Sequence, residues 1–131
     1  MSVTLEIFKI SSIEVVSDKA FVLENDDSGD FVIDSRSIDE ELYVESEYPF
    51  TALQEYRRIL RSKGMDVNCY GALPNVYPSP MLMNSTKAYY LTMHEPATMK
   101  CAVEIFDYFK VGKSSSVDSQ DDFYRKWIKS L

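Results

Sequence analysis

Histidine, cysteine and glycine are scarce in this 131-residue sequence, and each shortage removes a class of function. His94 is the only histidine, which excludes a metal site built from several histidines. Cys69 and Cys101 are too few for a disulfide scaffold, so a reducing cytoplasm is the expected location. The four glycines form no phosphate-binding loop, and no serine nucleophile elbow is present. We therefore expect no catalytic residue, no cofactor and no metal.

Long apolar runs are also absent. No run approaches the roughly 20 residues that are needed to span a bilayer. The first residues alternate polar and apolar side chains and include Glu6, so they do not predict a secretory signal. An apolar content of 45%, with 13% aromatic residues, is ordinary for a globular core. We expect a single domain over residues 1–131 and no membrane partner.

The remaining nucleophile to consider is a thiol. A Cys–His pair would have to combine His94 with Cys69 or Cys101. Both cysteines lie in apolar runs with strand character, where burial raises the pKa of a thiol and leaves it inert. The sequence therefore predicts two small buried apolar groups and not a catalytic cysteine.

The negative charge is concentrated in one half of the chain. Residues 1–50 carry 13 acids and three bases, a balance of −10, whereas residues 51–131 have a balance of +3. Ten carboxylates and one arginine fall between Glu24 and Glu47. This field repels phosphates, so we expect no nucleic acid as direct ligand, but it suits a basic protein partner. A surface that only keeps the protein soluble explains the same charge equally well.

The polar segment 24–30 invites comparison with a calcium-binding loop. If Gly29 takes the sixth position of an EF-hand loop, Ser35 falls where a bidentate glutamate is required. No helix is predicted on either side of it. The sequence predicts a solvated turn in which acidic side chains and Gly29 satisfy the local backbone.

Alternation of polar and apolar residues predicts an α+β fold. Strands are expected over residues 3–10, 20–23, 31–33, 42–44, 65–69, 87–93 and 101–106. We expect a mostly antiparallel sheet of five to seven strands. A central helix over residues 51–63 packs on it, and a C-terminal helix over residues 118–130 closes an end or covers an edge.

The central helix has recognisable ends. Thr51 and Gln54 have capping-box spacing at its start, and Gly64 ends it. Leu53, Tyr56 and Leu60 form an apolar stripe that must be buried. Four cations crowd the last two turns, where they favour the negative end of the helix dipole; an anion site is the alternative. These cations are Arg57, Arg58, Arg61 and Lys63.

The C-terminal helix is expected to begin at Asp118 as N-cap, after the small-residue segment 112–116, which is the one clear hinge. Phe123, Trp127 and Leu131 recur every four residues, and Trp127 is expected to anchor the helix.

Between the helices, residues 73–83 contain three prolines, which make a loop rigid without making it regular. Asn75, Tyr77 and Ser79 in this loop are candidates for function, and covering the end of the core is the alternative.

Residues 50–110 resemble a group of small bacterial immunity proteins from contact-dependent growth inhibition and polymorphic toxin systems. The matching positions are Leu53, Arg57, Leu60, Gly64, Cys69-Tyr70-Gly71-Ala72, Asn75-Val76-Tyr77-Pro78-Ser79, Met81, Lys87-Ala88-Tyr89 and Val103-Glu104-Ile105-Phe106-Asp107. The chain differs at Pro80, where the family pattern has glycine, and at residues 84–86, where that pattern is richer in glycine.

The resemblance implies a protein that binds and neutralises a cognate toxin domain, which we expect to be basic and of nuclease type. Its acids would steer the toxin, and tyrosines would anchor it. The candidate partner-binding residues are Asp39, Glu40, Glu41, Tyr43, Glu45, Glu47, Tyr48, Asn75 and Tyr77. A regulatory or scaffold protein is the alternative, followed by a small enzyme with carboxylate chemistry. The oligomeric state and strand order stay open.

Overall fold

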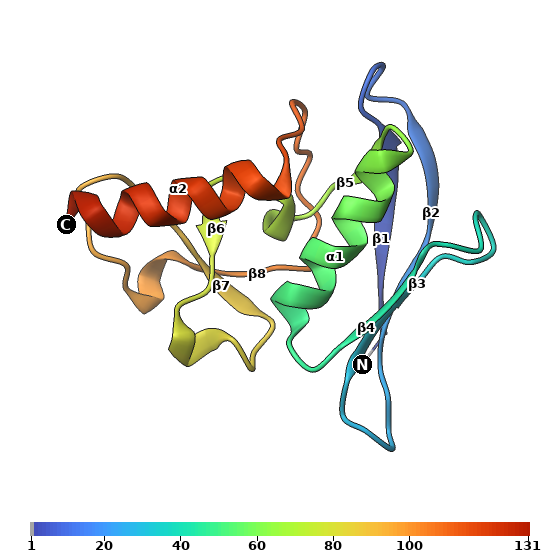
Figure 1. The fold of residues 1–131 in the computed structure, drawn as a ribbon, viewed down its shortest axis with the longest axis horizontal. Helices are drawn as coiled ribbons and strands as arrows, with labels where there is room; N and C mark the ends of the chain where they lie inside the picture. Colours follow the sequence, from blue (N-terminus) through green and yellow to red (C-terminus); the bar gives the residue numbers. More distant parts are fainter. Residues whose placement is uncertain (1) are drawn as a thin grey trace.

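Two antiparallel sheets and two α-helices make up residues 2–131, the part of the chain that the computed structural model describes (Figure 1). The larger sheet has the order β4-β3-β2-β1-β5 and contains β1 Ser2–Lys9, β2 Val15–Glu24, β3 Phe31–Asp34, β4 Tyr43–Ser46 and β5 Met65–Val67. The smaller sheet has the order β6-β7-β8, with β6 Val76–Tyr77, β7 Lys87–Tyr90 and β8 Ala102–Glu104. The helices are α1 Pro49–Ser62 and α2 Val117–Ser130. The predicted α+β class is confirmed.

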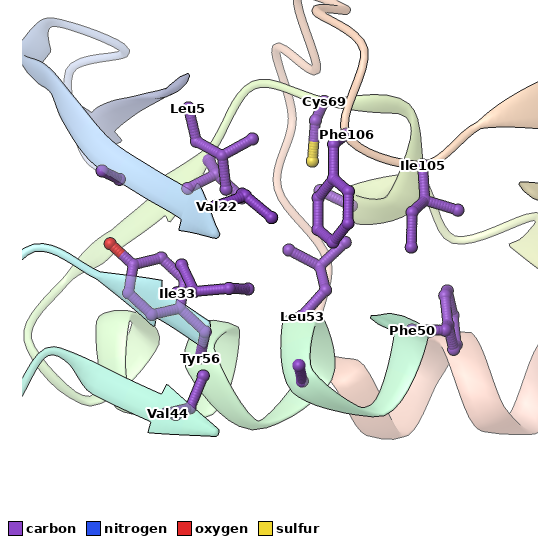
Figure 2. Packing of buried hydrophobic residues seen from close by; sticks show 14 of the residues in the cluster. Leu5, Val22, Ile33, Val44, Phe50, Leu53, Tyr56, Cys69, Ile105 and Phe106 are labelled. Carbon is purple, nitrogen blue, oxygen red and sulfur yellow. The ribbon is translucent and has the colours of Figure 1, made fainter. Parts of the chain in front are cut away.

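Helix α1 packs on one face of the larger sheet, as its apolar stripe predicts. Leu53, Tyr56 and Leu60 are fully buried and belong to one cluster with Ile33 and Val44 of the sheet. Figure 2 shows Leu53 directed toward the side chains that the second half of the chain contributes to this core. The same cluster contains residues of the smaller sheet, so both sheets share one core.

The helix starts differ from the prediction. Tyr48 is the N-cap of α1 without a side-chain hydrogen bond, and Pro49 occupies the first turn, so the predicted capping box at Thr51 is wrong. Proline suits this place because its missing N–H has no partner in the first turn anyway. In α2 the N-cap is Ser116, whose hydroxyl accepts a hydrogen bond from the Ser119 N–H at 3.1 Å. Asp118 lies in the first turn instead, where its charge still favours the helix dipole.

Two strands of the smaller sheet are shorter than predicted. The predicted strand 87–93 ends at Tyr90, and the strand predicted over 101–106 is reduced to Ala102–Glu104, with the 3₁₀ turn Met99–Cys101 before it. Strand β6 was not predicted. It pairs Val76 with Tyr90 and Tyr77 with Tyr89, and two residues are too few to give a periodic pattern.

The segment 24–30 is the solvated turn that the sequence predicts. The Asn25 side-chain oxygen accepts hydrogen bonds from the N–H groups of Asp27 at 2.9 Å and Ser28 at 3.3 Å. Gly29 has a φ of 75°, which is the left-handed conformation that glycine adopts without strain. Within residues 2–131, no helix is long and apolar enough to cross a bilayer.

Candidate functional site

One face of the larger sheet is packed against α1, and the opposite face is open. Residues paired across an antiparallel sheet lie on the same face, and neighbours along a strand lie on opposite faces. Val22, Ile33 and Val44 are paired in register and buried in the core. Their neighbours along β2, β3 and β4 therefore face away from α1. Phe21 and Leu23, which are 42% and 41% exposed, show that this second face is not covered.

Two cross-strand rows form this open surface, which we call the outer sheet face. One row runs Thr4, Phe21, Asp34 and Tyr43, and the next runs Leu23, Val32 and Glu45. Val32 is buried in the middle of the surface, whereas the side chains around it are partly or largely exposed. The result is an apolar and aromatic centre that lies beside carboxylates.

Tyr43 is held in place on this surface by a neighbouring ion pair. Arg36 donates two hydrogen bonds to Asp34, from Nε to Oδ1 at 3.0 Å and from its terminal nitrogen to Oδ2 at 2.9 Å. The guanidinium also lies over the Tyr43 ring, 4.4 Å from its centroid, in a cation–π contact. The hydrogen bonds from Arg36 lower the pKa of Asp34 below its usual range. This contact restricts the positions that the Tyr43 ring can take.

Glu45 connects the outer sheet face to the acidic turn 24–30. Asn25 Nδ2 and Ser28 Oγ lie 3.4 and 3.5 Å from its Oε1, so the turn is anchored beside the second row. Asp26 and Asp27 in this turn are exposed. We call this turn the acidic rim, because it adds carboxylates along one side of the apolar centre.

Most carboxylates between Glu24 and Glu47 have no internal counter-charge. Asp34 pairs with Arg36, and Asp39 and Glu41 pair with Lys63 at 3.1 and 3.4 Å. The other seven of the ten form no ion pair within residues 2–131. These seven are Glu24, Asp26, Asp27, Asp30, Glu40, Glu45 and Glu47.

The structure places the predicted partner-binding residues in separate locations. Tyr43 and Glu45 lie on the outer sheet face. Asp39 and Glu41 lie in the loop before β4, tied to the end of α1 through Lys63, with Glu40 exposed between them. Glu47 and Tyr48 lie in the connection between β4 and α1. Asn75 and Tyr77 lie at β6 in the smaller sheet.

Tyr77 connects β6 to α2 through contacts inside the protein. Its ring stacks on Tyr124 with centroids 4.2 Å apart and meets Phe50 edge-on at 5.0 Å. Its hydroxyl donates a hydrogen bond to Asp121 Oδ1 at 2.9 Å, and burial together with this carboxylate raises its pKa to about 12. Asn75 Nδ2 lies 3.4 Å from the Leu91 carbonyl oxygen. Tyr77 and Asn75 thus make contacts within the protein. This agrees with the second interpretation of the proline-rich loop, in which residues 73–83 cover the end of the core.

A fully buried ion pair was missed by the sequence analysis. Arg57 donates from Nε to Asp66 Oδ1 at 2.9 Å and from a terminal nitrogen to Asp66 Oδ2 at 3.0 Å, and neither side chain is exposed. Arg61 adds a second cation at 3.2 Å from Asp66, and Arg58 pairs with Asp118 at 3.3 Å. These three arginines at the end of α1 therefore form ion pairs within the protein, which disfavours the anion-site alternative and is compatible with the dipole interpretation.

Gln120 extends this polar centre to α2. Its Nε2 lies 2.8, 2.9 and 3.0 Å from the carbonyl oxygens of Gly71, Leu73 and Val76. Its Oε1 accepts hydrogen bonds from Gln54 at 3.2 Å and from Arg57 at 3.5 Å. A buried residue that satisfies several backbone carbonyls fixes the position of α2 on the rest of the fold.

The segment 112–116 is not a free hinge. Arg57 donates a hydrogen bond to the Ser115 carbonyl oxygen at 2.5 Å, and Arg61 donates one to the Ser114 hydroxyl. Ser114 in turn donates to Asp66. Residues 112–116 pass close to the buried ion pair, so their side chains must be small. This explains why the segment has the small-residue composition of a flexible linker.

The two thiols lie in different environments. Cys69 is fully buried, and burial raises its pKa to about 12. Cys101 is only partly buried, in the turn before β8, and its Sγ lies 3.0 Å from the Thr98 carbonyl oxygen. The prediction that both thiols are buried is therefore wrong for Cys101.

His94 is hydrogen-bonded to the end of α2, where its backbone N–H donates to Ser130 Oγ at 2.9 Å.

This difference predicts two rates of thiol labelling. At pH 8 without denaturant, a maleimide reagent is expected to modify Cys101, which lines a surface recess of about 190 Å³, and to leave Cys69 unmodified. Unfolding in urea exposes the second thiol. Mass spectrometry counts the labels, and Cys101→Ser should reduce the native-state count to zero. Two rapid labels on the native wild-type chain would contradict the burial of Cys69.

No family model matches this chain, and no curated protein matches it. The resemblance to immunity proteins therefore stays a prediction.

Proposed function

We propose that this chain is an immunity protein that neutralises a basic toxin domain by binding it on the outer sheet face. The observation that supports the proposal best is the composition of that face. Exposed Phe21 and Leu23 and the half-buried Tyr43 lie there beside Glu45 and the acidic rim, whose carboxylates form no ion pair within residues 2–131.

The two parts of this surface suit the two steps of capture. Unpaired carboxylates attract a basic partner over a distance and raise the association rate. Aromatic and apolar side chains at the centre of an interface then provide most of the binding free energy once water is excluded. Tyr43 suits this role because Arg36 already orders its ring, so little conformational entropy is lost on binding.

The negative charge around the outer sheet face also determines which kind of molecule can bind there. Nucleic acid is disfavoured because its phosphates would meet the carboxylates of a half that carries −10. A second copy of the chain would bring the same acidic rim against itself. A basic protein domain complements both the charge and the apolar centre, and we place the toxin's positively charged surface here.

We expect a basic toxin domain to be encoded beside this chain, and protection from that domain tests the proposal. Wild-type chain, co-expressed with that domain in a sensitive bacterium, is expected to restore growth. In the purified pair, the association rate at low salt should fall at least tenfold in the variant Asp26→Asn, Asp27→Asn, Glu45→Gln, because the steering charge is removed.

The matched control removes three charges elsewhere. Glu55, Glu95 and Asp107 are exposed and form no ion pair within residues 2–131, so their amide variant loses the same net charge. Its association rate is expected to stay within about twofold of wild type. If both variants slow association equally, the outer sheet face is not the steering surface. If the wild-type chain neither binds nor protects, the immunity function is wrong.

A further inference from the structure

The loop that joins β1 and β2 contains a residue in an unfavourable backbone conformation. Ile13 has a φ of 63°, in the left-handed region. Glycine, asparagine and aspartate occupy this region readily, but a β-branched side chain there is an outlier. Gly29, in the next hairpin turn, has the expected residue type at a φ of 75°. Isoleucine at position 13 therefore destabilises this loop relative to glycine, asparagine or aspartate.

The surrounding residues make this loop a firm apolar projection. Two backbone hydrogen bonds lie within the loop: the Lys9 N–H donates to the Glu14 carbonyl oxygen at 2.9 Å, and the Ile13 N–H donates to the Lys9 carbonyl oxygen at 2.8 Å. A third ties the loop to the end of α1, where the Ile10 N–H donates to the Gly64 carbonyl oxygen at 2.9 Å. We call residues 10–16 the hairpin tip. In Figure 1 this dark-blue loop stands out beyond the end of α1.

Three aliphatic side chains of the hairpin tip are exposed to water, beside exposed Ser11, Ser12 and Glu14. Ile13, Val15 and Val16 are 46%, 58% and 40% exposed. Strained residues persist where function retains them, so an observed outlier supports a functional hypothesis. We propose that the hairpin tip inserts Ile13 into an apolar pocket of the toxin domain that the outer sheet face captures. The inference rests on the proposed function and adds a second contact to it.

Other occupants fit the tip less well. A stable dimer buries about 1,200–2,000 Å² in total, and two short convex tips facing each other cannot supply that area. A membrane surface is disfavoured because the N-terminal half, with a balance of −10, repels anionic lipid, although Lys9 and Lys19 offset Glu14 and Asp18 beside the tip. A concave pocket on a protein accepts a convex aliphatic projection, and a basic protein is already favoured by the charge.

Three substitutions at position 13 distinguish the effect of backbone strain on stability from the effect of the side chain on toxin binding. Ile13→Asn and Ile13→Thr both remove the aliphatic side chain, but only asparagine relieves the left-handed strain. The Asn variant is therefore expected to melt about 4 °C above the Thr variant. Both should bind the toxin domain encoded beside this chain at least about tenfold more weakly than wild type. Ile13→Val keeps a β-branched aliphatic group and is expected to stay within threefold of wild type.

The measurements are thermal unfolding by circular dichroism and titration calorimetry with the purified toxin domain. Equal melting temperatures for the Asn and Thr variants would remove the strain argument. Affinities equal to wild type would show that the tip makes no contact. A variant of the outer sheet face, Tyr43→Ala, is titrated in parallel. If Tyr43→Ala alone weakens binding, the tip proposal fails and the proposed function stands; if the wild-type chain does not bind, both fail.

Discussion

Replacing Asp66 with asparagine is expected to lower the free energy of unfolding by about 3–5 kcal/mol. The substitution preserves the shape of the side chain and removes its charge. Arg57 is then left fully buried with no counter-charge in bidentate contact, and Arg61 loses the same partner. Urea unfolding followed by circular dichroism gives the free energy directly. Such a loss is a large part of the 5–15 kcal/mol that stabilises an ordinary domain.

Asp118→Asn is the matched control for this change. Asp118 also pairs with an α1 arginine, Arg58, but its side chain is 87% exposed. Exposed ion pairs contribute about 0–1 kcal/mol, so this variant is expected to unfold close to wild type. If Asp66→Asn were no more destabilising than Asp118→Asn, the buried pair would not brace the fold.

Replacing Trp127 with alanine is expected to have a comparable effect, about 3–5 kcal/mol. Trp127 is 9% exposed, and its Nε1 lies 3.1 Å from the Thr92 carbonyl oxygen and 2.9 Å from that of Glu95. The substitution removes a large buried side chain and leaves both carbonyls without this donor. The predicted role of Trp127 as the anchor of α2 is confirmed by its position, and urea unfolding measures its size.

The neighbouring residue provides the control for helix effects. Ile128→Ala changes a side chain that is 47% exposed on the same helix and is expected to cost less than about 1 kcal/mol. A loss as large as that of Trp127→Ala would mean that α2 is held by its whole length. This is the opposite of the account given for Trp127 and Gln120.

The sequence predicts the local structure well because local structure depends on near neighbours. The spacing of Leu53, Tyr56 and Leu60 specifies the face of α1 that is buried, and the structure confirms it. The apolar spacing of α2 predicts less: Leu131 lies just beyond the helix and is 60% exposed, whereas the polar Gln120 is fully buried. A polar residue on that face has no signal in a hydrophobic pattern.

Long-range pairing is what the sequence leaves open. Arg57 looks like one of four cations at a helix end, and only the packing of β5 beside α1 brings Asp66 to it. Tyr77 looks like an exposed loop tyrosine until α2 folds over it. Likewise, Ala20 to Leu23 is a wholly apolar run, so the sequence does not say that Phe21 and Leu23 face water. The sheet register supplies that information.

The outer sheet face is the place where we propose that a toxin domain binds. Titration calorimetry of the wild-type chain and of the variant Phe21→Ser, Tyr43→Ala with that domain tests this directly. We expect the variant to bind at least about 100-fold more weakly, since interface anchors contribute about 2 kcal/mol or more each. Tyr108→Ala, at a 60% exposed tyrosine of the other half, should bind as wild type does. Unchanged affinity in a correctly folded Phe21→Ser, Tyr43→Ala variant would contradict the account.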